Sequence, residues 1–490
     1  MTKADFRYQD EHPHEECGVF GLFAPGEDVA RICYFGLYTL QHRGQESAGI
    51  ATANCGKIYC HKKMGLVSQV FDETLLSQMK GDSAIGHVRY STTGSSVITN
   101  AQPLVFNTNL DNFALAHNGN LVNSSALRRH LTLNSDKLVT NSDSELIGKT
   151  IANVPEKNWE SKITKGLKNV HGSYSLLILT EKQLYAVRDP LGVRPLVLGR
   201  FNRGWVVSSE SCALDTIGAQ TIRELLPGEG IRIDESGVTQ FIPPHVGGKS
   251  GFCIFEYIYF ARPDSVLNKK LVYAARLEMG KQLCREHPVQ ADFVIPIPDS
   301  ATAAAIGFAE AAGLPFYEGL IKSRYIGRTF IQPDENLRRL GVKLKFNTLP
   351  QILKDKRVIV VDDSIVRGNT TKQIVLSLRQ AGVQQIHLRI SSPPLRHPCY
   401  LGIDIASYDE LIAHHKTILE IQRFLGVETL GYLSLKGLKK AIGKVQSGYC
   451  TGCFTGRYPL KKPSISHLAN PSLDSAPKFA IVKANYYNNR

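Results

Sequence analysis

The chain has 490 residues, of which 43% are hydrophobic and 21% are charged, an ordinary composition for a folded protein that is too long for one hydrophobic core. Its formal net charge of +14 leaves nucleic-acid binding open, but the basic residues are spread along the chain rather than clustered with aromatic residues. That distribution favours a small polyanionic substrate over nucleic acid.

The first residues, Met1 to Glu16, are polar and acidic rather than a secretion signal, which predicts a cytoplasmic protein. No uncharged apolar run approaches the roughly 20 residues of a membrane-spanning helix, so no membrane partner is expected. In the cytoplasm, ten cysteines are expected to serve metal binding or catalysis rather than disulfides. Cys17 follows the polar segment, and taken alone a cysteine there is more often a small buried hydrophobe than a nucleophile.

Four short motifs rich in polar residues and glycine follow Cys17 in the first half of the chain. They are Leu40–Gly49, Gly86–Gly94, Ala116–Asn120 and Thr140–Glu145. The β-rich segments Tyr174–Leu179 and Trp205–Ser209 come after them. This alternation predicts stacked sheets that carry a site on their connecting loops.

With Cys17, these motifs resemble the class II glutamine amidotransferase domain, an N-terminal-nucleophile hydrolase with an αββα sandwich. The resemblance implies a leader over residues 1–16, whose removal exposes Cys17, and an amidotransferase domain over residues 17–245. It also implies that Cys17 attacks the side-chain amide of glutamine to give a thioester and ammonia. A cysteine at a chain start has its own α-amine beside it, with a pKa of about 8, as a general base.

Further residues take roles by the same resemblance. Arg89 and Asp143 are expected to bind the α-carboxylate and the α-amine of glutamine, and a structural ion pair is the alternative for both. Asn118 and the backbone amide of Gly119 are expected to form an oxyanion hole, in which two fixed donors stabilise the tetrahedral oxygen. Arg43 is expected to support this site.

The connection Pro243–Gly248 is rich in proline and glycine, and we interpret it as the domain boundary. The segment Cys253–Ser265 then opens the second half of the chain. It resembles the corresponding junction of the amidophosphoribosyltransferases. The resemblance implies a type I phosphoribosyltransferase domain, built on a parallel sheet, over residues 251–456.

An apolar strand from Phe293 leads into a turn with Ser300 and then into an alanine-rich helix over Thr302–Ala312. Gly313 is expected to end that helix. The resemblance implies that the turn receives a pyrophosphate and that Ser300 joins Asp362 and Asp363 around Mg²⁺. A plain helix cap is the alternative for Ser300.

The segment Lys322–Arg339 is basic, bears hydroxyl groups and is broken by glycine and proline. These features predict a mobile lid, and the family has a closing loop at this place. A solvated basic loop is the alternative.

The aliphatic run Val358–Val361 predicts a strand that is buried on both faces, followed by two carboxylates, a small hydroxyl-rich loop and a helix over Lys372–Gln380. Backbone amides over Ser364–Thr371 could hold a phosphate at the helix N-terminus, and a solvated turn is the alternative. This arrangement resembles the phosphoribosylpyrophosphate loop of type I phosphoribosyltransferases. The resemblance implies that the substrate's phosphate is bound by Arg367, Gly368, Asn369, Thr370 and Thr371.

The spacing of Cys450 and Cys453 is typical of a metal site, and Cys253 and Cys399 could complete four thiolates. Spacing alone leaves zinc and iron–sulfur open. The surrounding residues resemble the amidophosphoribosyltransferase branch with a cleaved leader and a [4Fe-4S] cluster. We interpret the remaining cysteines as core or incidental, and residues 457–490, rich in proline, serine and lysine, as a flexible tail.

Taken together, the resemblance implies an enzyme that transfers ammonia from glutamine to phosphoribosylpyrophosphate, giving 5-phosphoribosylamine, the committed step of purine synthesis. Magnesium, a homo-oligomer and inhibition by purine nucleotides are expected with it. A glutamine amidotransferase that makes glucosamine 6-phosphate would need a sugar-isomerase second half, and Val358–Thr371 argues against one. A non-catalytic purine-sensing regulator is the other alternative, but it leaves Cys17 and Asn118 without a purpose.

Overall fold

The computed structural model describes residues 17–90, 96–108, 110–133, 136–244, 251–323, 346–403, 405, 407–443 and 448–460. The predicted leader, most of the predicted lid, residues 245–248 of the predicted boundary and residues 461–490 of the predicted tail lie outside these ranges. Among the described residues, none of the helices is both long and apolar enough to cross a membrane.

Two antiparallel sheets stack on each other in the first half of the chain. The larger has the strand order β11-β9-β10-β1-β4-β2-β3, with bounds Gln220–Glu224, Val197–Phe201, Gly204–Ser208, Gly18–Phe23, Ser83–Arg89, Ser47–Asn54 and Lys57–Met64. The smaller has the order β13-β12-β8-β7-β6-β5, with bounds Gly237–Ile242, Gly230–Asp234, Leu184–Arg188, Gly172–Thr180, Phe113–Leu121 and Leu104–Phe106. The strands predicted at Tyr174–Leu179 and Trp205–Ser209 correspond to β7 and β10.

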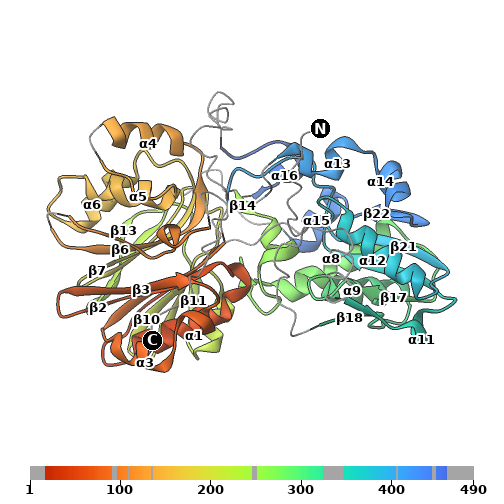
Figure 1. The fold of residues 1–490 in the computed structure, drawn as a ribbon, viewed down its shortest axis with the longest axis horizontal. Helices are drawn as coiled ribbons and strands as arrows, with labels where there is room; N and C mark the ends of the chain where they lie inside the picture. Colours follow the sequence, from red (N-terminus) through yellow and green to blue (C-terminus); the bar gives the residue numbers. More distant parts are fainter. Residues whose placement is uncertain are drawn as a thin grey trace, which may run out of the picture.

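Helices cover the two outer faces of this pair of sheets (Figure 1). The larger sheet carries α1 (Val29–Thr39), α2 (Val67–Val70), α3 (Glu73–Gln78) and α7 (Ser211–Thr216), and the smaller carries α4 (Ser124–Leu133), α5 (Asp143–Ala152) and α6 (Trp159–Leu167). Buried aliphatic residues such as Val19, Ile85 and Leu177 fill the space between the sheets. The four layers confirm the predicted αββα sandwich.

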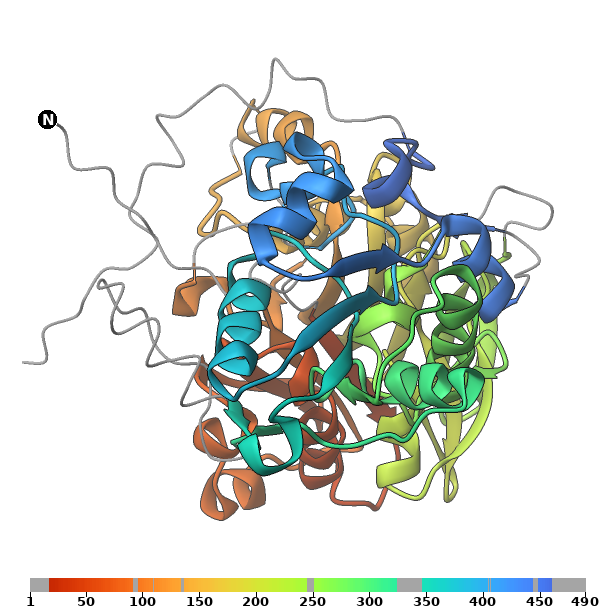
Figure 2. The ribbon, with the colours of Figure 1, turned by 90° about the vertical axis from the view of Figure 1, so that its right-hand side faces the viewer.

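A parallel sheet forms the centre of the second half. Its order is β17-β20-β21-β22, with bounds Phe293–Pro296, Arg357–Asp362, Gln385–Ile390 and Thr429–Tyr432. One face packs against α8 (Val272–Glu286), α9 (Thr302–Ala312) and α15 (Leu435–Ile442), and the other against α12 (Asn369–Gln380) and α14 (Ile418–Leu425). Figure 2 views this layered half from its outer end.

The central strand β20 has the double burial that its sequence predicts. Ile359 and Val361 pack into the core on the α8 and α9 side, whereas Val358 and Val360 pack into the core on the α12 side. Alternate residues of a strand point to opposite faces, so four consecutive aliphatic residues fit only a sheet covered on both sides. This confirms the predicted parallel-sheet fold.

The predicted start of the helix after β20 is wrong by one turn. The loop was expected to reach Thr371, but α12 begins at Asn369. Gly368 adopts a left-handed conformation at the N-cap, with φ of +81°, which turns the chain directly into the helix. The predicted helix over Thr302–Ala312 is correct, and Gly313 ends it in a left-handed conformation.

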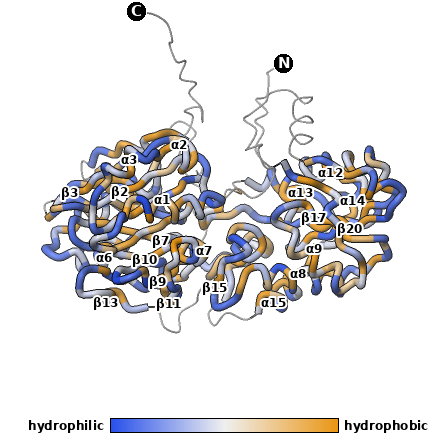
Figure 3. Tube along the Cα trace, turned by 90° about the horizontal axis from the view of Figure 1, so that it is seen from below, coloured by the Kyte–Doolittle hydropathy of each residue, from blue (hydrophilic) through white to orange (hydrophobic). Residues whose placement is uncertain are grey.

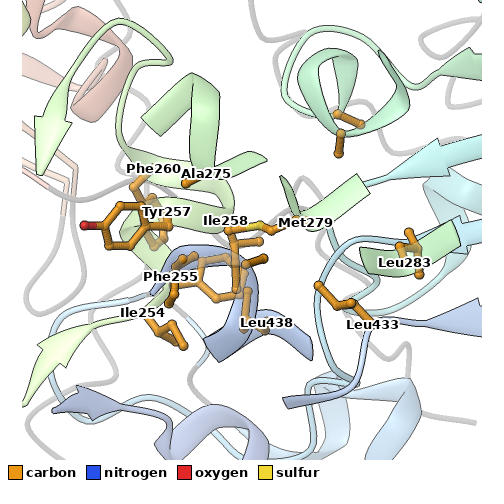
Figure 4. Packing of buried hydrophobic residues seen from close by; sticks show 14 of the residues in the cluster. Ile254, Phe255, Tyr257, Ile258, Phe260, Ala275, Met279, Leu283, Leu433 and Leu438 are labelled. Carbon is orange, nitrogen blue, oxygen red and sulfur yellow. The ribbon is translucent and has the colours of Figure 1, made fainter. Parts of the chain in front are cut away.

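The junction segment that opens the second half contains a π-helical turn over Glu256–Phe260, which lies in the core of that half (Figure 4). Phe255 and Ile258 pack there near Met279 and Leu438. Short elements complete this half: β14 (Phe252–Cys253), β15 (Val266–Leu267), β16 (Lys270–Leu271), β18 (Leu320–Lys322), β19 (Phe346–Thr348), α11 (Pro350–Leu353), α13 (Ile412–His415), β23 (Tyr449–Cys450) and α16 (Gly452–Thr455). The two halves lie side by side in Figures 1 and 3.

Candidate active site

Cys17 lies immediately before β1, beside the end of β4. The register of these strands pairs Gly18 with Val88. The Cys17 thiol donates to the carbonyl oxygen of Tyr90 across 3.4 Å. Arg43, whose guanidinium is buried, donates from Nε to the Cys17 carbonyl oxygen at 3.2 Å. The thiol and the carbonyl group of Cys17 are therefore each held by a contact with a distant segment.

Charged side chains surround the thiol. Burial raises the pKa of Cys17 from 9.0 to about 11. The hydrogen bond to Tyr90 and the charge of Arg89 lower that pKa, whereas the carboxylates of Glu46 and Asp143 raise it. The structure thus brings Cys17, Arg89 and Asp143 together. At neutral pH the thiol is protonated, so it needs a proton acceptor before it can attack.

The two residues predicted to bind the ends of an amino acid are both buried. Arg89 ends β4, and its Nη1 lies 3.4 Å from Oε2 of Glu46. Asp143 begins α5, and its Oδ2 accepts a hydrogen bond from the Leu121 amide at 3.0 Å. Structural ion pairing, the alternative for these residues, is present at Arg89, which pairs with Glu46, and Nδ1 of His117 lies 3.7 Å from Oδ1 of Asp143.

Asn118 lies on β6 with its side chain buried. Its Nδ2 has no hydrogen-bond partner among the described residues. An unpaired buried donor costs free energy, about 1–3 kcal/mol for an amide. A ligand oxygen at this position would satisfy it, as an oxyanion hole requires.

The backbone amide of Gly119 is directed toward the same side of β6 as Asp143. The amides of His117 and Leu121 donate to Gln102 Oε1 and Asp143 Oδ2, at 2.8 and 3.0 Å. Because amide direction alternates along a strand, the Gly119 amide shares their side. A Cβ atom on Gly119 would lie 2.0 Å from the carbonyl oxygen of Ser173, so only glycine fits.

Three side chains that support this site, Gln102, Glu210 and Glu256, could not be predicted from the sequence. Gln102 accepts from the His117 amide and donates to Ser144 Oγ at 3.0 Å, which ties β6 to the first turn of α5. Glu210 and Glu256 accept from the Arg43 guanidinium at 2.6 and 2.9 Å. None of the three stands in a motif with its partners, which lie far away in the sequence, so no local signal could have found them.

The predicted magnesium residues meet at the end of β20. The Ser300 hydroxyl donates to one oxygen of Asp363, and the Ser364 hydroxyl donates to the other at 2.5 Å. The Asp363 amide donates to Asp362 Oδ1 at 2.9 Å. Ser300 is not the helix cap that was its alternative, because the N-cap residue of α9 is Ala301.

The pair of carboxylates fits a divalent cation. Asp362 and Asp363 are both about 1% exposed. Burial and the neighbouring charge of Asp363 raise the pKa of Asp362 well above its usual value. Two buried carboxylates ionise together only with a nearby positive charge, and Mg²⁺ is held by few carboxylates plus substrate phosphates.

The predicted phosphate-binding residues form the first turn of α12 and the residues before it. The first helical bond runs from the Lys372 amide to the Gly368 carbonyl. The amides of the first helical turn, at Asn369, Thr370 and Thr371, precede this bond, and the N-terminus of a helix is a place where an anion can bind. The Arg367 guanidinium pairs with Glu410.

Four cysteines converge from separate segments of the second half. Cys253 on β14 stands opposite Cys450 on β23 in a parallel pair. The Cys453 carbonyl accepts from the amide of His397 at 3.0 Å, two residues before Cys399. Burial, with a smaller contribution from neighbouring thiols, raises the pKa of Cys253 to about 12 and that of Cys450 to about 11.

The donor set of these four thiols fits a metal cluster. Within the described ranges, no group of three or more His, Cys, Asp or Glu side chains is close enough to hold a single metal ion. Four cysteine thiolates are the ligand set of a [4Fe-4S] cluster, so the chemistry of the donors matches the predicted group. Of the other cysteines, Cys33, Cys212 and Cys284 are buried, and Cys55 and Cys60 are exposed.

Comparison with known proteins gives matches over nearly the whole chain. The family model for a glutamine amidotransferase domain matches residues 87–216. An amidophosphoribosyltransferase of Synechococcus elongatus is 48% identical over 459 residues, which cover 92% of this chain and 93% of that protein.

Two solved structures are similar in both sequence and fold. The glutamine phosphoribosylpyrophosphate amidotransferase of Bacillus subtilis, complexed with ADP and GMP, has a TM-score of 0.85 and 44% identity, and the match covers 90% of this chain and 97% of that one. A structure described as the allosteric regulatory enzyme of purine biosynthesis has a TM-score of 0.86 and 42% identity, over 95% of this chain and 100% of that one.

Proposed function

Because this chain belongs to the amidophosphoribosyltransferase family, we propose that its two candidate sites divide one reaction between them. The enzyme transfers ammonia from glutamine to 5-phosphoribosyl 1-pyrophosphate and forms 5-phosphoribosylamine, glutamate and pyrophosphate, the committed step of purine synthesis. Because the relatives with this identity and coverage are enzymes, the alternative of a non-catalytic purine-sensing regulator is set aside.

The first site hydrolyses glutamine. Arg89 binds the α-carboxylate and Asp143 the α-amine, which places the side-chain amide at the Cys17 thiol. The sulfur attacks the amide carbon, ammonia leaves, and water later cleaves the thioester to give glutamate. Nδ2 of Asn118 and the amide of Gly119 stabilise the tetrahedral oxygen.

Removal of residues 1–16 supplies the base for this step. The protonated Cys17 thiol needs an acceptor, and the α-amine released by cleavage before Cys17 lies on the same residue. With the leader attached, that nitrogen belongs to a peptide bond and cannot take a proton.

The second site binds the activated ribose. Asp362, Asp363 and Ser300 would hold Mg²⁺, which supplies positive charge to the pyrophosphate leaving group. The amides in the first turn of α12, with Arg367 and Gly368, bind the 5-phosphate. The C1 carbon of the ribose is thereby held where ammonia from the first site can reach it.

A [4Fe-4S] cluster on Cys253, Cys399, Cys450 and Cys453 would cross-link the start of the second half to its end. We propose a structural rather than a redox role, because the four thiols join separate chain segments. A homo-oligomer, a cytoplasmic location and sites for purine nucleotides such as the ADP and GMP of the Bacillus subtilis complex belong to the same proposal.

One observation carries the assignment of the first site. A cation, Arg89, and an anion, Asp143, both lie close enough to Cys17 to shift the pKa of its thiol. This charge pattern matches the zwitterionic end of a free amino acid next to a nucleophile.

The test is a pyrophosphate-release assay after anaerobic purification, with either glutamine or ammonium chloride as the nitrogen donor. Cys17→Ala is expected to abolish turnover with glutamine and to keep turnover with ammonia. Asp362→Asn is expected to impair both. Full activity of Cys17→Ala with glutamine would overturn the first site, and full activity of Asp362→Asn the second.

The same preparation tests the proposed leader and cluster. Intact mass should show the loss of residues 1–16. Iron and sulfide should each be present at about four atoms per chain and should be lost in Cys253→Ser, with Cys284→Ser as the control. A chain that starts at Met1 yet uses glutamine, or iron retained in Cys253→Ser, would contradict the respective proposal.

A further inference from the structure

The end of strand β6, next to Asn118 and Gly119, is fastened to a segment of the second half, Tyr400–Gly402. Asn120 donates from Nδ2 to the Tyr400 carbonyl at 3.0 Å. Ser173 donates from Oγ to the Leu401 carbonyl at 2.8 Å. These bonds join residues more than two hundred positions apart in the sequence.

Ser173 connects this contact to β6 itself. Its Oγ accepts a hydrogen bond from the Asn120 amide at 3.1 Å while it donates to Leu401. The hydroxyl therefore links the backbone of β6 to the Leu401 carbonyl through two hydrogen bonds. Ser173 is fully buried, so water does not replace either bond without a change in packing.

The segment also packs directly on Gly119. A Cβ atom on Gly402 would lie 2.9 Å from the Arg194 guanidinium and 3.4 Å from the Gly119 carbonyl carbon. On its other side, Gly119 has no room for a Cβ atom against Ser173. Gly119 is thus packed between Ser173 and Gly402, which limits the movement of its backbone.

The Tyr400–Gly402 segment has an anchor of its own. The Leu401 amide donates to the sulfur of Cys399 at 3.3 Å, and the Arg194 guanidinium donates to the Leu401 carbonyl. The segment therefore presents its two carbonyl groups to β6 in a fixed orientation.

We propose that Asn120 and Ser173 are positioning residues for glutamine hydrolysis, which hold the Asn118 and Gly119 donors in place by fastening β6 to Tyr400 and Leu401. The inference rests on the proposed function, because it takes Asn118 and Gly119 as the oxyanion donors. It makes hydrolysis in the first half depend on a backbone contact supplied by the second half.

A positioning role predicts a specific kinetic pattern. Arg89 and Asp143 bind the ground state of glutamine, whereas the two donors act on the oxygen that becomes negative in the transition state. A displaced donor therefore lowers kcat and leaves KM nearly unchanged. A misplacement of about 1 Å costs up to about 100-fold, so we expect a loss of about 10-fold to 100-fold.

The experiment compares Asn120→Ala, Ser173→Ala and Asn118→Ala with the parent enzyme. Glutaminase kcat and KM, ammonia-dependent turnover and inhibition by glutamate γ-semialdehyde are measured for each. The Cys17 thiol adds to the aldehyde carbon to give a thiohemiacetal. The former carbonyl oxygen then lies where the oxyanion of the tetrahedral intermediate would lie. The inhibition constant of the aldehyde should rise in parallel with the loss of kcat, while ammonia-dependent turnover stays at the parental level.

Asn123→Ala is the matched control. Asn123 follows β6 and its Nδ2 donates to the Asn169 carbonyl at 2.8 Å, within the first half. This variant should keep the parental kcat and aldehyde affinity.

The outcomes separate the inference from the proposed function. Loss of glutaminase activity in Asn118→Ala but not in Asn120→Ala or Ser173→Ala would overturn the inference alone. Parallel loss of ammonia-dependent turnover in the latter two would also overturn it, because it would indicate a general structural role. Parental activity of Asn118→Ala would overturn the oxyanion assignment on which the inference rests.

Discussion

The Cys17 side chain sets the chemical requirement of the first site. Its thiol is partly buried beside two carboxylates, and its pKa of about 11 leaves almost no thiolate at pH 7. Burial thus keeps the nucleophile inactive until a base is present on the same residue. Cleavage of the leader would supply that base and would leave the surrounding side chains unchanged.

This environment of the thiol predicts how its alkylation depends on pH in a chain from which the leader, ending at Glu16, has not been removed. Because the thiolate reacts, the rate of Cys17 alkylation by iodoacetamide should rise about tenfold per pH unit from pH 8 to pH 10. Glu46→Gln removes a charge that raises the pKa, so its profile should shift to lower pH. The alkylated Cys17 peptide is quantified by mass spectrometry, with exposed Cys55 as the internal control. A plateau below pH 9 would contradict this prediction.

The side chains with a chemical role in the first site could be predicted from the sequence, whereas the residues that hold them in place could not. Cys17, Arg89 and Asp143 stand in motifs that resemble those of the class II glutamine amidotransferases, and the structure places them together. Gln102, by contrast, acts through backbone and hydroxyl groups of residues far along the chain. A hydrogen bond of this kind depends on the fold and leaves no local pattern.

At the scale of elements, the helix pair α8 and α9 positions Ser300. The two helices approach so closely that a Cβ atom on Gly280 would lie 1.8 Å from the Ala304 carbonyl oxygen. A Cβ atom on Gly307 would lie 1.9 Å from the carbonyl oxygen of Leu277. Since α9 begins two residues after Ser300, its position also sets the contact of Ser300 with Asp363.

Gly280→Ala and Gly307→Ala are therefore expected to destabilise the protein. Each added methyl group meets a backbone oxygen and forces the helices apart, which should cost about 1–3 kcal/mol despite the better helix propensity of alanine. Urea unfolding measures the loss. Gly437→Ala in α15 is the control, because its methyl group meets the flexible end of Glu286, and it should cost less. Equal midpoints for all three variants would contradict this account.

Element boundaries were predictable where composition changes sharply. The alanine run over Thr302–Ala312 followed by Gly313 gave the correct helix, and the aliphatic run before Asp362 gave the correct strand. The predicted start of α12 was wrong because Asn369, Thr370 and Thr371 are residue types typical of loops. Only the left-handed conformation of Gly368 places them in a helix.

At the scale of the whole molecule, a buried ion network joins the two halves. Arg43 from the first half pairs with Glu210 of the same half and with Glu256 of the junction. All three side chains are nearly fully buried. Removal of Arg43 would leave the buried carboxylates of Glu210 and Glu256 without this cation. This costs far more folding free energy than the loss of an exposed ion pair.

Arg43→Ala should lower the free energy of unfolding by about 3–5 kcal/mol. Arg31→Ala is the matched control, because Arg31 also meets two carboxylates, Asp28 and Glu73, but is 35% exposed and should cost at most about 1 kcal/mol. Urea unfolding at pH 7 measures both variants. Similar losses in the two would show that burial does not set the strength of this network.

The same network predicts an acid dependence. Burial would raise the pKa of Glu210, but the charges of His42 and Arg43 lower it far below its ordinary value of 4.5. A depressed pKa stabilises the folded state above the ordinary value, and this stabilisation is lost as the pH falls below it. The difference between the parent and Arg43→Ala should therefore shrink below pH 4.5, as unfolding at pH 7 and pH 3.5 can measure.

The pairing of β14 with β23 has a consequence for biosynthesis. It brings residues 252–253 beside residues 449–450, so the first strand of the second half gains its partner only after almost two hundred intervening residues have been translated. The sandwich of the first half can fold while the ribosome is still working, whereas the four-cysteine site has to wait for residue 453. Assembly of the proposed [4Fe-4S] cluster would then be one of the last events in the maturation of this enzyme.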